Sequence, residues 1–263
     1  MNTGPMMNAS RLIGFCLCLT LLGACVTASK SGSSVPSESE AAIANTNLGA
    51  GYLRQGKPDL AVERLTRALD QDPRNAEAHS MIALAYDQLG SVEEAEDHYK
   101  RAVQLQPENG LSANAYAVFL CRHKRWKDSE PYFNRAADSR TYRTPEMALT
   151  NAGNCAADNG DPAKAADYYR SALARNKTYA DALHGMMDLS YQQKNYLQAR
   201  AFVQRYLDSQ QASAPVLWLC VNVERELANR TAMDKCAAQL KSGFPASHEV
   251  EQLQALQQSN GGQ

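Results

Sequence analysis

One motif recurs along this sequence every 34 residues, and this spacing limits the folds that the chain can adopt. Between Ala76 and Asn109, small and apolar residues lie on one face of each of two expected helices, which Gly90 separates. The pattern consists of Ala83, Tyr86, Ala95, Ala102 and Pro107, and 34 residues earlier the same places hold Gly49, Tyr52, Ala61, Ala68 and Pro73. Small residues let two helices approach closely, and the proline ends the second one. A helix–turn–helix unit that recurs in this way predicts an array of stacked repeats.

The pattern continues toward the C-terminus with a shift of two residues near Pro145. We place six units near residues 42–75, 76–109, 110–143, 146–179, 180–213 and 214–247, the last of them degenerate. This pattern resembles the tetratricopeptide repeat (TPR). The expected fold is therefore all-α, a superhelical solenoid of about six helix–turn–helix repeats, and residues 248–263 are expected to form a C-terminal cap and tail. The alternative is an ordinary helical bundle in which the spacing is a coincidence.

The first residues are typical of an export sequence. Residues 1–24 hold one charged side chain, Arg11, and an apolar run, Leu12–Leu22, that is too short to span a bilayer. The run ends in Leu-Gly-Ala-Cys, which resembles a bacterial lipobox, so Cys25 is predicted to carry a thioether-linked diacylglycerol. Val26 stands where an Asp commonly retains such lipoproteins at the inner membrane, so the resemblance favours the outer membrane. The alternative is a plain secretory signal with an incidental cysteine.

The amino-acid composition and the motifs of the chain limit the classes of function that we expect. Residues 25–41 are Ser-rich and are expected to form a flexible tether after the lipidated Cys25. Removal of residues 1–24 leaves 26 Lys and Arg against 28 Asp and Glu, a net charge of −2. A protein that binds nucleic acid usually carries an excess of positive charge, so this class of function is not expected. The sequence contains no nucleotide-binding or hydrolase motif, so we expect no catalytic residues, cofactor or small-molecule substrate. No metal site is expected either, because Cys121 and His123 have no partner pair nearby.

Four of the seven cysteines lie in the expected array. Cys121 and Cys155 are one repeat apart, late in the first helices of units three and four, and such helices stack side by side. Cys220 and Cys236 lie on the two helices of unit six. In an exported protein these spacings predict a disulfide between Cys121 and Cys155. A second disulfide could form between Cys220 and Cys236. Four cysteines allow three connectivities, and all four could also be buried and reduced.

The first helix of each repeat is expected to face the inner surface of the array. In units one to three these helices supply mostly apolar residues, which predicts a partner-binding face. The residues are Ile43, Ala50, Leu53, Leu84, Leu111 and Val118. An extended or helical peptide could anchor on such a face. The alternative is that some of these side chains are buried against neighbouring helices.

Three stretches together resemble one family of envelope proteins. They are LGAGYLRQGKPDLAVERLTRALDQDP at 48–73, NAYAVFLCRHKRWKDSEPYFNRAADSRTYRTP at 114–145 and NAGNCAADNGDPAKAADYYRSALARN at 151–176. With the lipobox and tether, they are similar to the PilF/PilW family of type IV pilus biogenesis lipoproteins. The resemblance also covers the cysteine pair at Cys121 and Cys155, which is disulfide-bonded in part of that family.

This resemblance implies a function. Members act as pilotins: on the periplasmic face of the outer membrane, they bind subunits of the pilus secretin and promote their localisation and multimer assembly. The expected partners are thus the secretin and, through the acyl anchor, the outer-membrane bilayer. The alternative is a general periplasmic TPR scaffold for cell-wall or outer-membrane assembly proteins.

Overall fold

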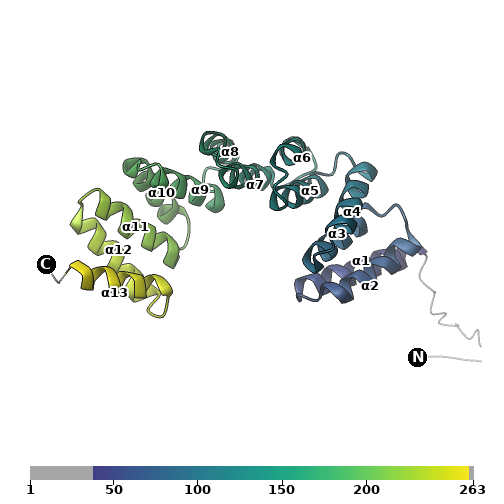
Figure 1. Cartoon of the computed structure of the whole chain (residues 1–263), viewed down its shortest axis with the longest axis horizontal. Helices are drawn as coiled ribbons and strands as arrows, with labels where there is room; N and C mark the ends of the chain where they lie inside the picture. Colours follow the sequence, from purple (N-terminus) through teal and green to yellow (C-terminus); the bar gives the residue numbers. More distant parts are fainter. Residues whose placement is uncertain (1–37, 261–263) are drawn as a thin grey trace, which may run out of the picture. The chain divides into compact units, whose positions relative to one another are not determined.

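The computed structural model describes residues 38–260, and all regular structure in this range is α-helical. Thirteen helices follow one another in chain order (Figure 1). They are α1 (Glu38–Arg54), α2 (Pro58–Gln71), α3 (Ala76–Leu89), α4 (Val92–Leu105), α5 (Gly110–Arg122), α6 (Trp126–Asp138), α7 (Pro145–Asp158), α8 (Pro162–Arg175), α9 (Ala180–Gln192), α10 (Tyr196–Ser209), α11 (Ala214–Glu226), α12 (Arg230–Gly243) and α13 (His248–Asn260). The first twelve form six pairs, and we call the odd-numbered member of each pair its A helix and the even-numbered member its B helix.

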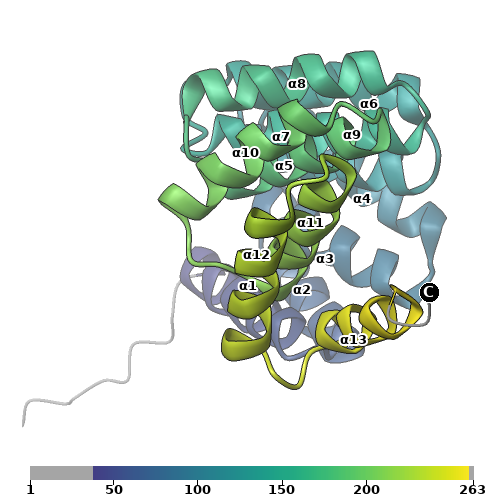
Figure 2. The same cartoon turned by 90° about the vertical axis from the view of Figure 1, so that its left-hand side faces the viewer.

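The pairs stack so that each contacts only its neighbours along the chain. Helix α3 packs against its partner α4, against α1 and α2 of the pair before it, and against α5 of the pair after it. The same relations recur up to α9, after which α11 packs on α10 of the pair before it, and α13 packs on α11 and α12. Figures 1 and 2 show this succession of helix pairs from two directions. The predicted all-α solenoid of helix–turn–helix repeats is therefore confirmed for residues 38–260.

The turns between A and B helices show the repeat directly. Each contains one residue with a positive φ angle, the left-handed conformation that commonly ends a helix. These residues are Gly56, Gly90, Lys124, Gly160, Lys194 and Ala228. They are 34 residues apart in sequence, except for the 36 residues between Lys124 and Gly160. The predicted two-residue shift thus lies between these two turns.

The extra residues belong to the loop Ser139–Thr144, between α6 and α7. This loop folds back on the connection between α4 and α5. The hydroxyl of Ser139 donates a hydrogen bond to the carbonyl oxygen of Glu108 at 2.8 Å. Tyr142 packs so close to Gly110 that a Cβ atom there would lie 2.6 Å from the Cβ of Tyr142. A longer connection is therefore accommodated by packing it onto the preceding repeat.

The core is a series of clusters between adjacent helices. In the second pair, Ala83 of α3 and Ala95 of α4 are fully buried, and Tyr99 of α4 fills the space beside them. Small residues at the closest approach and aromatic residues around it are the arrangement that the sequence pattern predicts. Because each cluster involves only neighbouring helices, the core extends along the chain.

One boundary differs from the sequence prediction. Helix α1 begins at Glu38, so residues 38–41 are helical and do not belong to the predicted tether at 25–41. Glu38 and Glu40 lie in the first turn of α1, where acidic side chains favour a helix. Helix α13 extends to Asn260. The predicted signal peptide at 1–24, Cys25 and the rest of the tether lie outside the described residues.

Candidate binding groove

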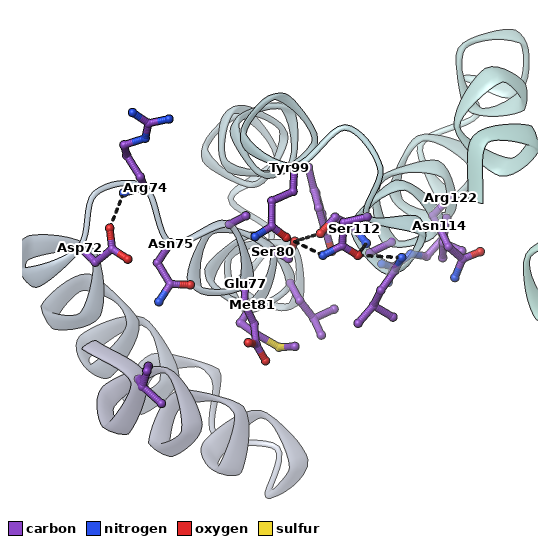
Figure 3. A pocket seen from close by; sticks show the side chains of 18 residues that line it. Asp72, Arg74, Asn75, Glu77, Ser80, Met81, Tyr99, Ser112, Asn114 and Arg122 are labelled. Carbon is purple, nitrogen blue, oxygen red and sulfur yellow. Dashed lines mark hydrogen bonds between the residues drawn. The ribbon is translucent and has the colours of Figure 1, made fainter. Parts of the chain in front are cut away.

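A groove of about 700 Å³ lies along the A helices of the first three pairs. Its walls come from α1, α3 and α5, from Tyr99 of α4 and from the α2–α3 and α4–α5 connections. The lining residues are Ile43, Asp72, Arg74, Asn75, Ala76, Glu77, Ser80, Met81, Leu84, Tyr99, Gln106, Asn109, Leu111, Ser112, Asn114, Ala115, Val118 and Arg122. Figure 3 shows these side chains from close by.

The floor of the groove is apolar and open to solvent. Ile43 of α1 and Leu111 of α5 both line this hollow and expose 54% and 53% of their surface. Leu84 of α3 and Val118 of α5 are half-buried between them. Exposed apolar side chains that converge in one hollow are typical of a protein-binding surface.

Four of the six residues predicted for the binding face line this groove, and two do not. Leu53 lies on another side of α1 and packs into the cluster between α2 and α3. Ala50 is half-buried on α1 and does not line the groove either. The sequence prediction placed these two residues on the open face because it assumed one shared register for all A helices. Leu53 instead closes the core of the first pair.

Polar side chains hold neighbouring A helices together beside the groove. Asn75, the N-cap of α3, accepts a hydrogen bond from the backbone N–H of Ala78 at 2.9 Å. Three further bonds cross from one repeat to the next: Asn75 Nδ2 to Thr46 Oγ1 (3.4 Å), Ser80 Oγ to Ser112 Oγ (2.9 Å) and Asn151 Nδ2 to Asn114 Oδ1 (3.1 Å). These bonds join α3 to α1, α5 to α3 and α7 to α5, and the first two position the groove walls relative to each other.

The charged side chains of the groove are balanced. Arg122 pairs with Asp87, whose side chain is only 5% exposed, and Nε2 of His123 contacts the same carboxylate at 3.0 Å. At the other end of the groove, Arg74 and the acidic residues Asp72 and Glu77 line the wall, and the backbone N–H of Arg74 donates a hydrogen bond to Asp72 Oδ1 at 3.0 Å (Figure 3). Since acidic and basic groups nearly cancel, the groove does not select a strongly charged ligand. It fits a segment with apolar side chains.

A second network supports the groove wall from behind. The carboxylate of Glu96 on α4 accepts hydrogen bonds from Arg125 at 2.7 Å and from the Tyr116 hydroxyl at 3.2 Å, and it pairs with Lys100 at 2.8 Å. Partial burial acts to raise the pKa of Glu96, but the bonds from Lys100 and Arg125 outweigh it and lower the pKa to about 2. Tyr116 in turn stacks on Tyr99, which lines the groove.

A shallower hollow of about 660 Å³ continues the groove toward the fourth pair. The two share Gln106, Asn109 and Leu111. The Ser139–Thr144 loop forms its far side. A bound segment could therefore extend past Leu111 along the N-terminal ends of the A helices.

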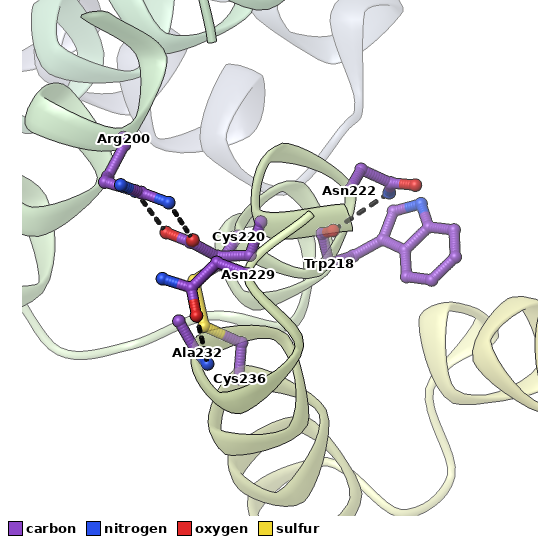
Figure 4. Close-up of a disulfide and its surroundings, with 8 residues drawn as sticks. Arg200, Trp218, Cys220, Asn222, Asn229, Ala232 and Cys236 are labelled. Carbon is purple, nitrogen blue, oxygen red and sulfur yellow. Dashed lines mark hydrogen bonds and ion pairs between the residues drawn. A yellow bond between two sulfur atoms is a disulfide. The ribbon is translucent and has the colours of Figure 1, made fainter. Parts of the chain in front are cut away.

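Both predicted cysteine pairs are disulfide-bonded in the structure. Cys121 of α5 and Cys155 of α7 have Cα atoms 5.8 Å apart, so this bond joins two neighbouring repeats. Cys220 of α11 and Cys236 of α12 have Cα atoms 6.0 Å apart, and this bond closes the sixth pair (Figure 4). Beside it, Arg200 of α10 donates a hydrogen bond from Nε to the buried carboxylate of Glu224 at 2.7 Å.

The described part of the chain offers little else for chemistry. Within residues 38–260, no group of three or more His, Cys, Asp and Glu side chains is arranged to hold a metal ion. In the same range, no helix has the length and apolar character needed to cross a bilayer. The groove is thus the feature of residues 38–260 that most clearly suggests a function.

Comparison with known proteins agrees with this architecture. The tetratricopeptide repeat family matches residues 46–110, 120–181 and 156–219. The type IV pilus assembly protein PilF of Pseudomonas aeruginosa is 27% identical over 254 residues, which cover 95% of this chain and 99% of PilF. An uncharacterized protein of Haemophilus influenzae is 34% identical over 136 residues, which cover 52% of this chain and 74% of that protein.

Solved structures give the same result. The structure of Pseudomonas aeruginosa PilF aligns with a TM-score of 0.69 at 26% identity, over 84% of this chain and 99% of that one. The structure of PilW, described as a widely conserved type IV pilus biogenesis factor, aligns with a TM-score of 0.69 at 27% identity, over 81% of this chain and 97% of that one. The chain therefore belongs to the tetratricopeptide repeat family, and over most of its length it is similar to the type IV pilus proteins PilF and PilW.

Proposed function

We propose that this protein is a pilotin, which binds subunits of the pilus secretin in the groove of its first three repeats and promotes their assembly at the outer membrane. The observation that carries the proposal is the open apolar floor formed by Ile43, Leu84, Leu111 and Val118. A soluble chain rarely exposes such residues together unless they contact a partner. The pilus role is supported by the similarity to PilF over 95% of this chain and to PilW over 81% of it. The choice of the secretin as partner is supported by the resemblance of the sequence to the pilotin family.

The proposal includes a lipid on Cys25, which lies outside the described residues. Two or three acyl chains give stable anchoring, whereas one chain gives only reversible binding. A subunit bound in the groove then travels to the membrane with the anchor. Subunits held near one surface also meet at a higher effective concentration, which favours a multimer without new contacts between them. No catalytic step is needed.

The groove is tested by Leu111→Glu, with Leu197→Glu as a matched control. Leu197 is 67% exposed on α10, outside the groove, so both changes place a carboxylate on an exposed leucine. We expect the Leu111 variant to lose secretin binding in a pull-down because the carboxylate would be desolvated against an apolar partner. The control should bind normally, and the circular dichroism spectra of both variants should match the wild type.

The biological readout is the heat-stable secretin multimer in outer-membrane fractions. A deletion strain should produce secretin monomers without multimers and should lack surface pili and twitching motility. Normal multimers in that strain would contradict the proposal. Capture of cell-wall or outer-membrane assembly proteins in place of secretin would favour the general scaffold.

The anchor is tested separately by Cys25→Ala. We expect this variant to leave the outer-membrane fraction and to bind secretin in the groove without delivering it. Processing of the wild-type chain should be blocked by globomycin, which inhibits the lipoprotein signal peptidase. An outer-membrane location that persists in the Cys25→Ala variant would exclude the lipid as the anchor.

A further inference from the structure

The outward side of α1, where the array begins, is uncharged and uncovered. From Ala41 to Leu53 this helix contains no charged residue. Ala44, Asn47 and Leu48 lie on its exposed side, and Leu48 has 51% of its surface in solvent. Every later A helix has the preceding pair packed against it, whereas within residues 38–260 nothing precedes α1.

The opposite end of the array is closed in a different way. Helix α13 packs on α11 and α12 through the buried residues Val250 and Leu253. Its outer side exposes glutamines, among them Gln252 and Gln254. A terminal helix with a polar outer face is the usual cap of a repeat array. The exposed side of the first helix instead presents Ala44 and Leu48 beside Asn47, which indicates that this side contacts something.

Local contacts on α1 support a contact from outside. The side chains of Asn45 and Thr46 are used within the array, by bonds to Gln71 and to the carbonyl oxygen of Ala42. Asn47 next to them makes no side-chain hydrogen bond within residues 38–260. One turn further on, a Cβ atom at Gly51 would meet only Arg54, at 3.8 Å. Nothing inside the array therefore requires Gly51 to be small, whereas a second helix could use the room.

We propose that this side of α1, formed by Ala44, Asn47, Leu48 and Gly51, packs against the same side of α1 in a second copy of the chain. The two helices run parallel about a two-fold axis. Each Asn47 then faces its equivalent, and an amide supplies both a donor and an acceptor to its partner. A central asparagine fixes the register of parallel helix pairs in the same way.

Other occupants fit this surface less well. Helices that lie on a bilayer carry basic and aromatic residues, whereas α1 begins with two glutamates and has no Lys or Arg before Arg54. Residues 26–37, which precede α1, are mostly Ser and other polar residues, with only two valines to bury. They offer too little apolar surface to cover α1. A second copy supplies a matching uncharged surface.

The preceding segment is compatible with the parallel orientation. Residues 26–37 span at most about 40 Å when fully extended. If Cys25 is anchored, as the proposed function requires, every copy begins its α1 within this distance of the same membrane surface, and parallel pairing places the starts of both helices at the same height above it. One helix face is smaller than the ~800 Å² per partner of a stable interface. The pair therefore depends on the high effective concentration at the membrane.

Cysteine crosslinking in membranes tests the proposal with the full chain. Asn47→Cys places a thiol at the centre of the proposed contact, and Thr66→Cys places one on the exposed side of α2 as a control. Mild oxidation should yield several-fold more disulfide-linked dimer at position 47 than at position 66. Addition of Leu48→Glu should reduce the yield to the control level. Ile43 is left unchanged because it lines the groove.

Three results would overturn the proposal. They are equal crosslinking at the two positions, absence of crosslinking at position 47 in a membrane-associated and folded chain, and a yield that survives Leu48→Glu. Binding of the lipid-free chain to vesicles of phosphatidylethanolamine and phosphatidylglycerol, if Leu48→Glu abolished it, would assign the surface to lipid instead. Secretin capture in the Leu48→Glu variant should remain normal, so the test is independent of groove binding.

Discussion

Tyr169 of α8 fits between two glycines, and this packing makes a sharp prediction about stability. A Cβ atom added at Gly153 of α7 or at Gly185 of α9 would lie 2.5 Å from the Tyr169 ring. The ring cannot move away from one glycine without approaching the other. Its hydroxyl also donates a hydrogen bond to Asn154 Oδ1 at 2.7 Å. The packing between the fourth and fifth pairs therefore requires that both positions lack a Cβ atom.

The expected cost of Gly185→Ala follows from two opposing terms. An inserted methyl group in a tight core costs about 1–3 kcal/mol. Replacing a helical glycine by alanine gains up to about 1 kcal/mol in helix propensity. At 2.5 Å from the ring the steric cost should lie in the upper part of this range, roughly 2–3 kcal/mol, so the net loss should be about 1–2 kcal/mol. Gly51→Ala is the matched control because its Cβ has room, and it should stabilise the chain by up to about 1 kcal/mol.

Urea unfolding of the lipid-free chain, followed by circular dichroism, measures both changes. A double variant with Tyr169→Leu adds a test of the cause. The smaller side chain should make room for the alanine, so the combined loss should be less than the sum of the two single losses. If Gly185→Ala were as stable as the wild type, or if the two losses simply added, the steric explanation would be wrong.

Three further predictions concern the disulfide, pH and turn geometry. Loss of the Cys121–Cys155 bond through the double alanine variant should lower the free energy of unfolding by roughly 3–4 kcal/mol, the value for a loop of this length, and mass mapping of the non-reduced protein should find the intact bond. Because the folded pKa of Glu96 is about 2, below its ordinary value of 4.5, its stabilising contribution should be present above pH 4.5 and lost as the pH falls toward 2. The urea midpoint of Glu96→Gln should accordingly change less between pH 5 and pH 3 than that of the wild type, and an equal change would contradict this. Lys194 has a φ angle of 58°, so Lys194→Gly should raise the midpoint by the equivalent of about 1 kcal/mol, and a lower midpoint would show that the left-handed turn carries no strain.

The repeats could be predicted because small and aromatic residues recur at the same positions of each repeat. Ala83, Ala95 and Tyr99 are buried where the pattern places them. The two-residue shift near Pro145 was also visible, since the pattern resumes after it. The left-handed turns at Lys124 and Lys194 could not be located by residue type, because no glycine marks them.

The groove was only partly predictable. Its apolar members share a helical periodicity, which identifies Leu84 and Leu111. Leu53 follows a similar pattern, yet it closes the first core, because a sequence does not specify how far each helix rotates against its neighbours. The Ser80–Ser112 bond connects residues from adjacent repeats and depends on the same rotation.

The central claim is that the groove of the first three repeats holds the secretin. It is tested most directly by a photo-crosslinking amino acid placed at Leu111 in living cells, with the same substitution at the exposed Leu197 as the control. Mass spectrometry of the crosslinked peptides should identify one segment of the secretin at position 111 and none at position 197. Secretin peptides at both positions, or only other envelope proteins at position 111, would contradict the account.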